Sequence, residues 1–114
     1  PLFVSHYFGK ILNIHPSLLP KFPGLNTHQQ AIDACEKIHG VSVHFVTEVL
    51  DGGPIISQES VCIETIDTAK TLSDKVLKKE HVIYLKVIHW YTQGRLKLNN
   101  KLTATLDGKI ICLK

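Results

Sequence analysis

The stretch "LNIHPSLLP" at residues 12–20 places an amide, an imidazole and a hydroxyl at alternate positions, Asn13, His15 and Ser17. On a β-strand this spacing puts all three side chains on one face, which can open into a crevice at the strand's carboxyl end. A neutral amide beside an imidazole suits the stabilisation of a developing oxyanion and the transfer of a proton. The same pattern is also typical of an ordinary hydrogen-bonded strand edge, so the spacing alone leaves both interpretations open.

Two further polar positions follow downstream. In "EVLDGGP", Asp51 precedes two glycines, which free the backbone to approach a ligand or simply to turn. His44 lies on the polar face of its predicted strand, so it could share one rim with Asp51. A serine hydrolase built from Ser17, His15 and Asp51 is disfavoured, because the chain lacks the G-x-S-x-G turn that exposes such a nucleophile.

The sequence gives no signal for a metal site. None of the seven histidines pair at the helical i, i+4 spacing, and there is no H-E-x-x-H or C-x-x-C motif. The three cysteines are odd in number, and we expect reduced, buried thiols, as in a cytoplasmic protein.

The elements that must position these residues alternate between strands and helices. We expect a strand over residues 10–14 that Pro16 closes, and then a loop over residues 18–26, which holds two prolines and a glycine. A helix is predicted from an N-cap at Thr27 to a terminator at Gly40, followed by two strands around the "DGG" turn.

The second half of the sequence predicts one long helix and a hairpin. Apolar residues recur near the helical period over residues 67–93, and Asp67 or Thr68 can cap the start. The tail predicts a β-hairpin with a turn at Asp107 and Gly108. The order of strands and helices indicates an α/β arrangement.

Composition limits the class of protein. The chain has 114 residues, which is typical of one domain or part of one, and it is 44% hydrophobic and 20% charged. The net charge of +3 comes from scattered lysines with no Arg-rich block, so no nucleic-acid partner is predicted. No apolar run approaches the roughly 20 residues of a membrane span. Since the sequence lacks methionine and begins in mid-pattern, we expect a fragment or a processed chain.

Two longer segments, "NIHPSLLPKFPGLNTHQQAI" and "HGVSVHFVTEVLDGGPIISQ", resemble the folate-dependent formyltransferase family in their order and spacing. The resemblance extends from about Phe3 to Lys97. It implies an α/β fold, with residues 1–114 forming the C-terminal half of a doubly wound, Rossmann-like sheet with flanking helices and a terminal β-hairpin. The N-terminal half of such a single domain, which binds phosphate, would lie outside these residues.

The resemblance implies transfer of a formyl group from 10-formyltetrahydrofolate to the amine of glycinamide ribonucleotide, in cytoplasmic de novo purine biosynthesis. Asn13, His15 and Asp51 match the family's catalytic trio. Asn13 would donate a hydrogen bond to the tetrahedral oxyanion, and His15 would add a second donor or act as general acid. Asp51 would hold and charge His15.

The same resemblance implies two sets of binding residues and a formyl-folate co-substrate without a metal. The ribonucleotide would be bound by His44, Glu80 and Pro16. The folate pocket would include Thr47, Glu48, Val49, Leu50 and Gly52.

Alternative functions remain open at this point. A formyltetrahydrofolate deformylase and a methionyl-tRNA formyltransferase share the asparagine, histidine and aspartate. A non-catalytic α/β interaction module could retain the motif as scaffold. We expect the 114 residues to be inactive alone and to work with a complementary N-terminal chain or as a homo-oligomer.

Overall fold

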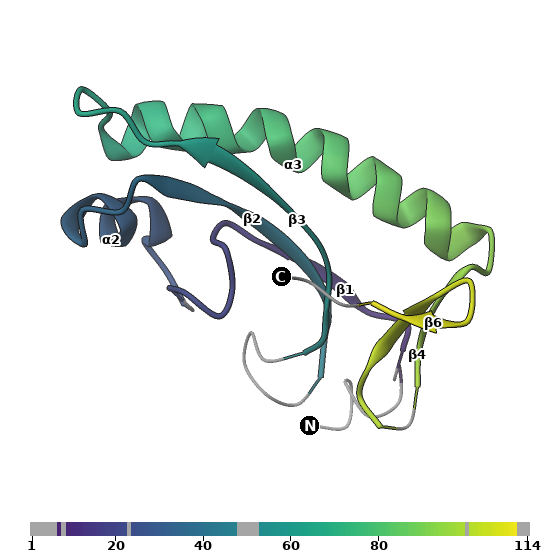
Figure 1. The fold of residues 1–114 in the computed structure, drawn as a ribbon. Helices are drawn as coiled ribbons and strands as arrows, with labels where there is room; N and C mark the ends of the chain where they lie inside the picture. The colour runs from purple at the N-terminus through teal and green to yellow at the C-terminus, as the bar shows by residue number, and fades with distance from the viewer. Residues whose placement is uncertain (1–6, 8, 23, 48–52, 100, 112–114) are drawn as a thin grey trace.

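The computed structural model of the chain describes residues 7, 9–22, 24–47, 53–99 and 101–111. Its central feature is an antiparallel sheet of three strands, in the spatial order β1-β2-β3 (Figure 1). The strands are β1 (Leu12–His15), β2 (Ile38–Phe45) and β3 (Ile55–Cys62). A helix of 24 residues, α3 (Ala69–Thr92), lies along one face of this sheet (Figure 1).

Three smaller strands follow α3 and form a second antiparallel sheet. They are β4 (Leu96–Leu98), β5 (Ala104–Leu106) and β6 (Lys109–Ile110), in that spatial order. The predicted terminal hairpin is therefore confirmed as β5 and β6, which turn at Asp107 and Gly108, both with positive φ. The predicted α/β class is confirmed as well.

Alternation along β2 explains why α3 packs on one face of the sheet. Val41, Val43 and Phe45 point to that face and are fully buried. The buried residues of α3 recur near the helical period and complete the same core. The core cluster contains Val41, Val43, Phe45, Ile56, Leu72, Val76, Ile83, Val87, Leu96 and Ala104.

The start of α3 is fixed by a capping box. The Thr68 side chain accepts a hydrogen bond from the Thr71 backbone N–H, and the Thr71 hydroxyl accepts one from the Thr68 N–H. Asp67 accepts a hydrogen bond from the Thr71 hydroxyl and one from Lys75. The two bonds of the capping box satisfy backbone N–H groups that a helix start leaves without an intrahelical partner. The predicted caps are confirmed, with Thr68 as the N-cap.

The helix after the loop is shorter than the sequence pattern predicts. Helix α2 (Thr27–Asp33) ends seven residues before Gly40, and Cys35 then takes a positive φ of 56° that turns the chain toward β2. The N-cap position belongs to Asn26, whose side chain makes no cap hydrogen bond. Thr27 instead donates its hydroxyl to the Pro16 carbonyl, so the side chain predicted as a cap binds the preceding loop.

Gly40 lies inside β2 and does not end a helix. A Cβ atom at this position would stand 2.0 Å from the Glu59 carbonyl oxygen of β3. Its missing side chain therefore allows the two strands to approach closely. Two smaller predictions are also wrong. The first strand extends from Leu12 to His15 and not over residues 10–14. The thiols of Cys35 and Cys62 are exposed and not buried.

Candidate active site

A row of polar side chains crosses β1 and β2 on the face opposite α3. In the antiparallel register Asn13 pairs with His44, and His15 pairs with Ser42. Directly opposed residues of an antiparallel pair share one face. The structure therefore places three predicted site residues, Asn13, His15 and His44, side by side.

His15 is directed by the loop that follows β1. The residue is buried, with 5% of its surface exposed, and the Nε2 atom of its ring lies 2.8 Å from the carbonyl oxygen of Phe22. A carbonyl only accepts hydrogen bonds, so Nε2 carries a proton in this arrangement. His15 is thus oriented as a donor, whereas Asn13 beside it is exposed.

His44 is held by its own strand. Its Nδ1 atom lies 2.8 Å from the Phe45 carbonyl oxygen, and the side chain is 2% exposed. Since the carbonyl only accepts hydrogen bonds, Nδ1 carries a proton in this arrangement. The row therefore combines an amide with two imidazoles, each of which directs one N–H to a backbone carbonyl.

The serine that alternates with these residues serves the loop. Ser17 is fully buried and donates its hydroxyl to the Lys21 carbonyl at 2.6 Å. This bond and the burial leave Ser17 badly placed as a nucleophile, which again disfavours a serine hydrolase. Pro16, a predicted substrate contact, directs its carbonyl to Thr27 at the start of α2.

Most of the segment with the third catalytic candidate is outside the described residues. Glu48, Val49, Leu50, Asp51 and Gly52 all belong to that part of the chain.

The described residues on either side of this segment lie beside the row. A Cβ at Gly53 would stand 1.8 Å from the Phe45 carbonyl oxygen and 3.4 Å from the Thr47 side chain. The Phe45 N–H also donates a hydrogen bond to the Pro54 carbonyl oxygen, with the nitrogen and oxygen 3.1 Å apart. Phe45 follows His44 directly, so both ends of the segment are anchored next to the pair of Asn13 and His44.

Glu80 is separated from the row by the sheet. It lies on α3, which packs against the opposite face, and its side chain is half-buried. Burial raises the pKa of Glu80, and the charge of His81 partly offsets this. The structure thus does not bring Glu80 next to Asn13, and its contact with a ribonucleotide stays a prediction.

A second histidine pair, which the sequence analysis did not single out, lies under the loop. The Nδ1 atom of His28 and the Nε2 atom of His39 are 3.1 Å apart, and the Phe22 ring packs edge-on against His39. Burial lowers the pKa of His39 to about 4, the neighbouring His28 adds to this, and the Pro16 carbonyl and Glu36 oppose it. His39 is therefore a neutral group at neutral pH.

A concave region of about 850 Å³ lies next to the row but contains none of its residues. Its walls come from the loop, from the turn before β2 and from β3. The lining residues are Leu18, Leu19, Pro20, Lys21, Cys35, Glu36, Lys37, Ile38, Ile55 and Gln58. Apart from Gln58, the uncharged part of this lining is mostly apolar.

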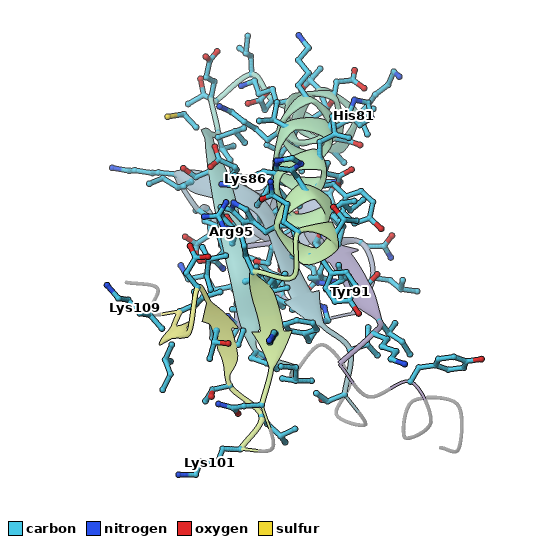
Figure 2. The ribbon with its side chains drawn as sticks, turned by 90° about the vertical axis from the view of Figure 1, so that its right-hand side faces the viewer. His81, Lys86, Tyr91, Arg95, Lys101 and Lys109 are labelled. Carbon is cyan, nitrogen blue, oxygen red and sulfur yellow. The ribbon has the colours of Figure 1, made fainter. Side chains whose placement is uncertain are left out.

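Within the described residues, no group of three or more histidine, cysteine, aspartate or glutamate side chains could hold a metal ion. None of the described helices is long and apolar enough to cross a membrane. Basic side chains such as Lys86, Arg95 and Lys109 extend from separate elements (Figure 2). Lys86 lies 5.2 Å from the centre of the Trp90 ring, and Arg95 pairs with Asp107.

Comparison with known proteins gives consistent matches. Residues 1–88 match the family described as "Formyl transferase". Over 109 residues the chain is 52% identical to "Phosphoribosylglycinamide formyltransferase" of Escherichia coli, covering 96% of this chain and 51% of that protein. The chain thus spans about half the length of such relatives.

Solved structures agree with the sequence matches. The phosphoribosylglycinamide formyltransferase of Coxiella burnetii superposes with a TM-score of 0.91 at 51% identity, covering 97% of this chain and 52% of that one. A formyltetrahydrofolate deformylase from Pseudomonas syringae reaches a TM-score of 0.86 at 28% identity, over 93% and 35% of the two chains. The fold is shared by both, and the sequence is closer to the former.

Proposed function

This chain belongs to the formyl transferase family, and we propose that it supplies the catalytic edge of a glycinamide ribonucleotide formyltransferase. The formyl group would pass from 10-formyltetrahydrofolate to the amine of glycinamide ribonucleotide, a step of de novo purine biosynthesis. The observation that carries the proposal is the row in which Asn13 faces His44 next to His15. High identity to proteins with this name supports the choice of acceptor.

The reaction begins when the acceptor amine attacks the formyl carbon, and negative charge then develops on the formyl oxygen. Exposed on β1, the Asn13 amide can donate a hydrogen bond to that oxygen. The Nε2–H of His15 can add a second donor once the oxygen replaces the Phe22 carbonyl. A pair of donors aimed at one oxygen stabilises the oxyanion more than the planar formyl group.

Two proton transfers accompany formyl transfer, and the proposal assigns them to His44 and Asp51. The attacking amine must lose a proton, and the leaving nitrogen of the folate must gain one. His44 pairs with Asn13 on the same row, and with Nδ1 protonated its neutral ring could accept a hydrogen bond from the amine at Nε2. Asp51, the proposed third catalytic residue, would hold His15 and help to pass the amine proton through water to the leaving nitrogen of the folate.

The binding assignments are also part of the proposal. Pro16 and Glu80 would contact the ribonucleotide, and the segment from Thr47 to Gly52 would contact the folate. Because the chain matches about half of its relatives' length, we propose that the active enzyme includes a second, N-terminal half or a partner chain that supplies it. The cytoplasm is the proposed location, and the free thiols of Cys35 and Cys62 agree with it.

Separate acceptors test the proposal directly. The longest natural polypeptide that contains these residues would be given 10-formyltetrahydrofolate with glycinamide ribonucleotide, methionyl-tRNA or water as the acceptor. We expect formylation of glycinamide ribonucleotide alone, and loss of this activity on Asn13→Ala. Release of free formate as the main product would instead favour a deformylase. Absence of any reaction with all three acceptors would favour a binding module.

The 114-residue chain gives a second experiment. We expect it to transfer no formyl group alone, since it spans about half the length of the relatives that it matches. Turnover by this chain that disappears on Asn13→Ala would contradict that expectation.

A further inference from the structure

A hydrogen-bond network outside the predicted site, buried at Ser42 and partly buried at Gln58, ties the loop after β1 to the sheet. Ser42 is fully buried, and its hydroxyl donates to the Ser17 carbonyl at 2.7 Å. The same oxygen accepts from the Leu19 N–H at 3.0 Å and from Gln58 Nε2 at 2.9 Å. Gln58 Nε2 also donates to the Leu19 carbonyl at 2.9 Å. One donor and two acceptor positions of the Ser42 hydroxyl are therefore all used.

This network lies directly beside the row of polar side chains on β1 and β2. Ser42 pairs with His15 on one side and with Gln58 on the other, so the three residues cross all three strands at one level. Both backbone groups of Leu19 are bound by Ser42 and Gln58. The backbone four residues after His15 is thus fixed to the strands that face His15.

Gly40 of β2 leaves space for the loop to pack against the sheet. Gly40 lies two positions before Ser42, on the same face of the strand. A Cβ at Gly40 would stand 2.8 Å from Leu18 Cδ2, in addition to its conflict with the Glu59 carbonyl. The loop therefore packs closely over Gly40 and is hydrogen-bonded at Ser42.

We propose that Gln58 is a positioning residue for the catalytic edge, acting on His15 through Ser42 and the backbone of residues 17–19. Gln58 fixes the direction in which the chain leaves β1, and this keeps the His15 ring beside Asn13 and His44. The kinetic part of this inference rests on the proposed formyl transfer, whereas its structural part does not. A buried network of this kind is rigid only while every member is satisfied.

Replacement of Gln58 by methionine tests the assignment. Gln58→Met keeps an unbranched side chain of similar size and removes both donated hydrogen bonds. In the full-length polypeptide we expect the Leu19 amide to exchange with solvent about fivefold to tenfold faster. We expect kcat to fall by about 10-fold to 100-fold with both KM values changed less than about twofold, because the defect is one of alignment. The ring nitrogen NMR signals of His15 should also shift.

Two comparisons make the experiment specific. Ser60→Ala changes an exposed residue two positions along β3 and should leave every readout unchanged. Ser42→Ala combined with Gln58→Met should lower kcat by less than the product of the two single effects, because both residues act on Leu19. If Gln58→Met does not fold, Gln58→Asn shortens the same carboxamide and carries the same readouts.

Unchanged exchange at Leu19 in Gln58→Met would overturn the proposal. Faster exchange with unchanged kcat would also overturn it, since the network would then only stabilise the loop. If the wild-type protein transfers no formyl group, the proposed function fails. In that case faster Leu19 exchange together with shifted His15 signals would still support the positioning role.

Discussion

Asn13 and His15 differ in exposure although they share one face of β1. Asn13 is exposed, whereas His15 is 5% exposed and its Nε2 atom is already hydrogen-bonded. An exposed amide can reach a ligand oxygen, and a buried ring has a fixed direction. Asn13 is thus suited to reach the formyl oxygen, and His15 is suited to donate a hydrogen bond in a fixed direction.

Removal of the Asn13 amide should lower the rate without unfolding the protein. Asn13→Ala in the full-length enzyme should reduce kcat about 100-fold to 1,000-fold, as expected for loss of one oxyanion donor. Steady-state kinetics with glycinamide ribonucleotide would measure this. Lys10→Ala, an exposed change just before β1, is the matched control and should have little effect. Similar kcat values for both variants would remove Asn13 from the catalytic role.

His39 should make the stability of the fold depend on pH. Its pKa is about 4 in the folded chain, against an ordinary value of 6.5, chiefly because the ring is buried. Between these values the unfolded chain binds more protons, so the stabilisation is complete above about pH 6.5 and is lost as pH falls toward 4. We expect this residue to contribute about 3 kcal/mol to that loss.

Denaturation in urea at a series of pH values would measure the effect of His39. His39→Gln should flatten the decrease between pH 6.5 and 4, although it also lowers stability at neutral pH. His81→Gln, which removes an exposed histidine of α3, should leave the decrease in place. An unchanged decrease in His39→Gln would show that other groups cause it.

The sequence could predict single reactive residues better than the contacts that hold them. Alternation along β1 identified Asn13 and His15, and alternation along β2 identified His44. Ser42 and Gln58 were missed because their role depends on the register of three strands and on a loop 23 or more residues away. The only local signal was a small polar residue between two buried valines of β2.

At the scale of elements, Gly40 sets how closely β2, β3 and the loop can pack. Gly40→Ala should destabilise the protein by about 1–3 kcal/mol or more, because the new Cβ meets a backbone oxygen that cannot move aside alone. Urea denaturation would show this as a lower midpoint. Ser60→Ala changes its cross-strand partner and should alter stability by no more than about 0.5 kcal/mol.

The two helices show where sequence patterns work. The predicted boundaries of α3 agree with Ala69–Thr92 within two residues, because capping signals and a long apolar period coincide there. The pattern overestimated α2, since "DACEKIH" continues to look helical. Pairing of Ile38 and His39 with β3 instead draws that segment into the sheet. Tertiary contacts outweighed local propensity at this point.

At the scale of the whole molecule, α3 holds the two sheets on one core. Its 24 residues extend about 36 Å at 1.5 Å per residue, close to the longest dimension of 43 Å. Leu96 of β4 and Ala104 of β5 belong to the same core cluster as Val41 of β2. Loss of packing at the helix should therefore affect both sheets together.

Two neighbouring residues of α3 test this packing. Ile83→Ala should lower the free energy of unfolding by about 2–5 kcal/mol, since the side chain is fully buried. Leu85→Ala, at a position that is 70% exposed, should change it by no more than about 0.5 kcal/mol. Urea denaturation of both variants gives the comparison. Equal losses would indicate that Leu85 is covered in the protein by something beyond the described residues.

The register of β1 has a consequence for the order of folding. β2, β3 and α3 follow one another closely along the chain. The connection from β1 to β2 is longer: it contains a loop and α2 and has 22 residues in total, Pro16–Lys37. Closing that longer loop costs more conformational entropy, so β1 is expected to join after the hairpin and helix have formed. Substitutions in β1 would then accelerate unfolding and leave the refolding rate nearly unchanged. Substitutions in β1, the strand that carries Asn13 and His15, should therefore not delay the folding of β2, β3 and α3.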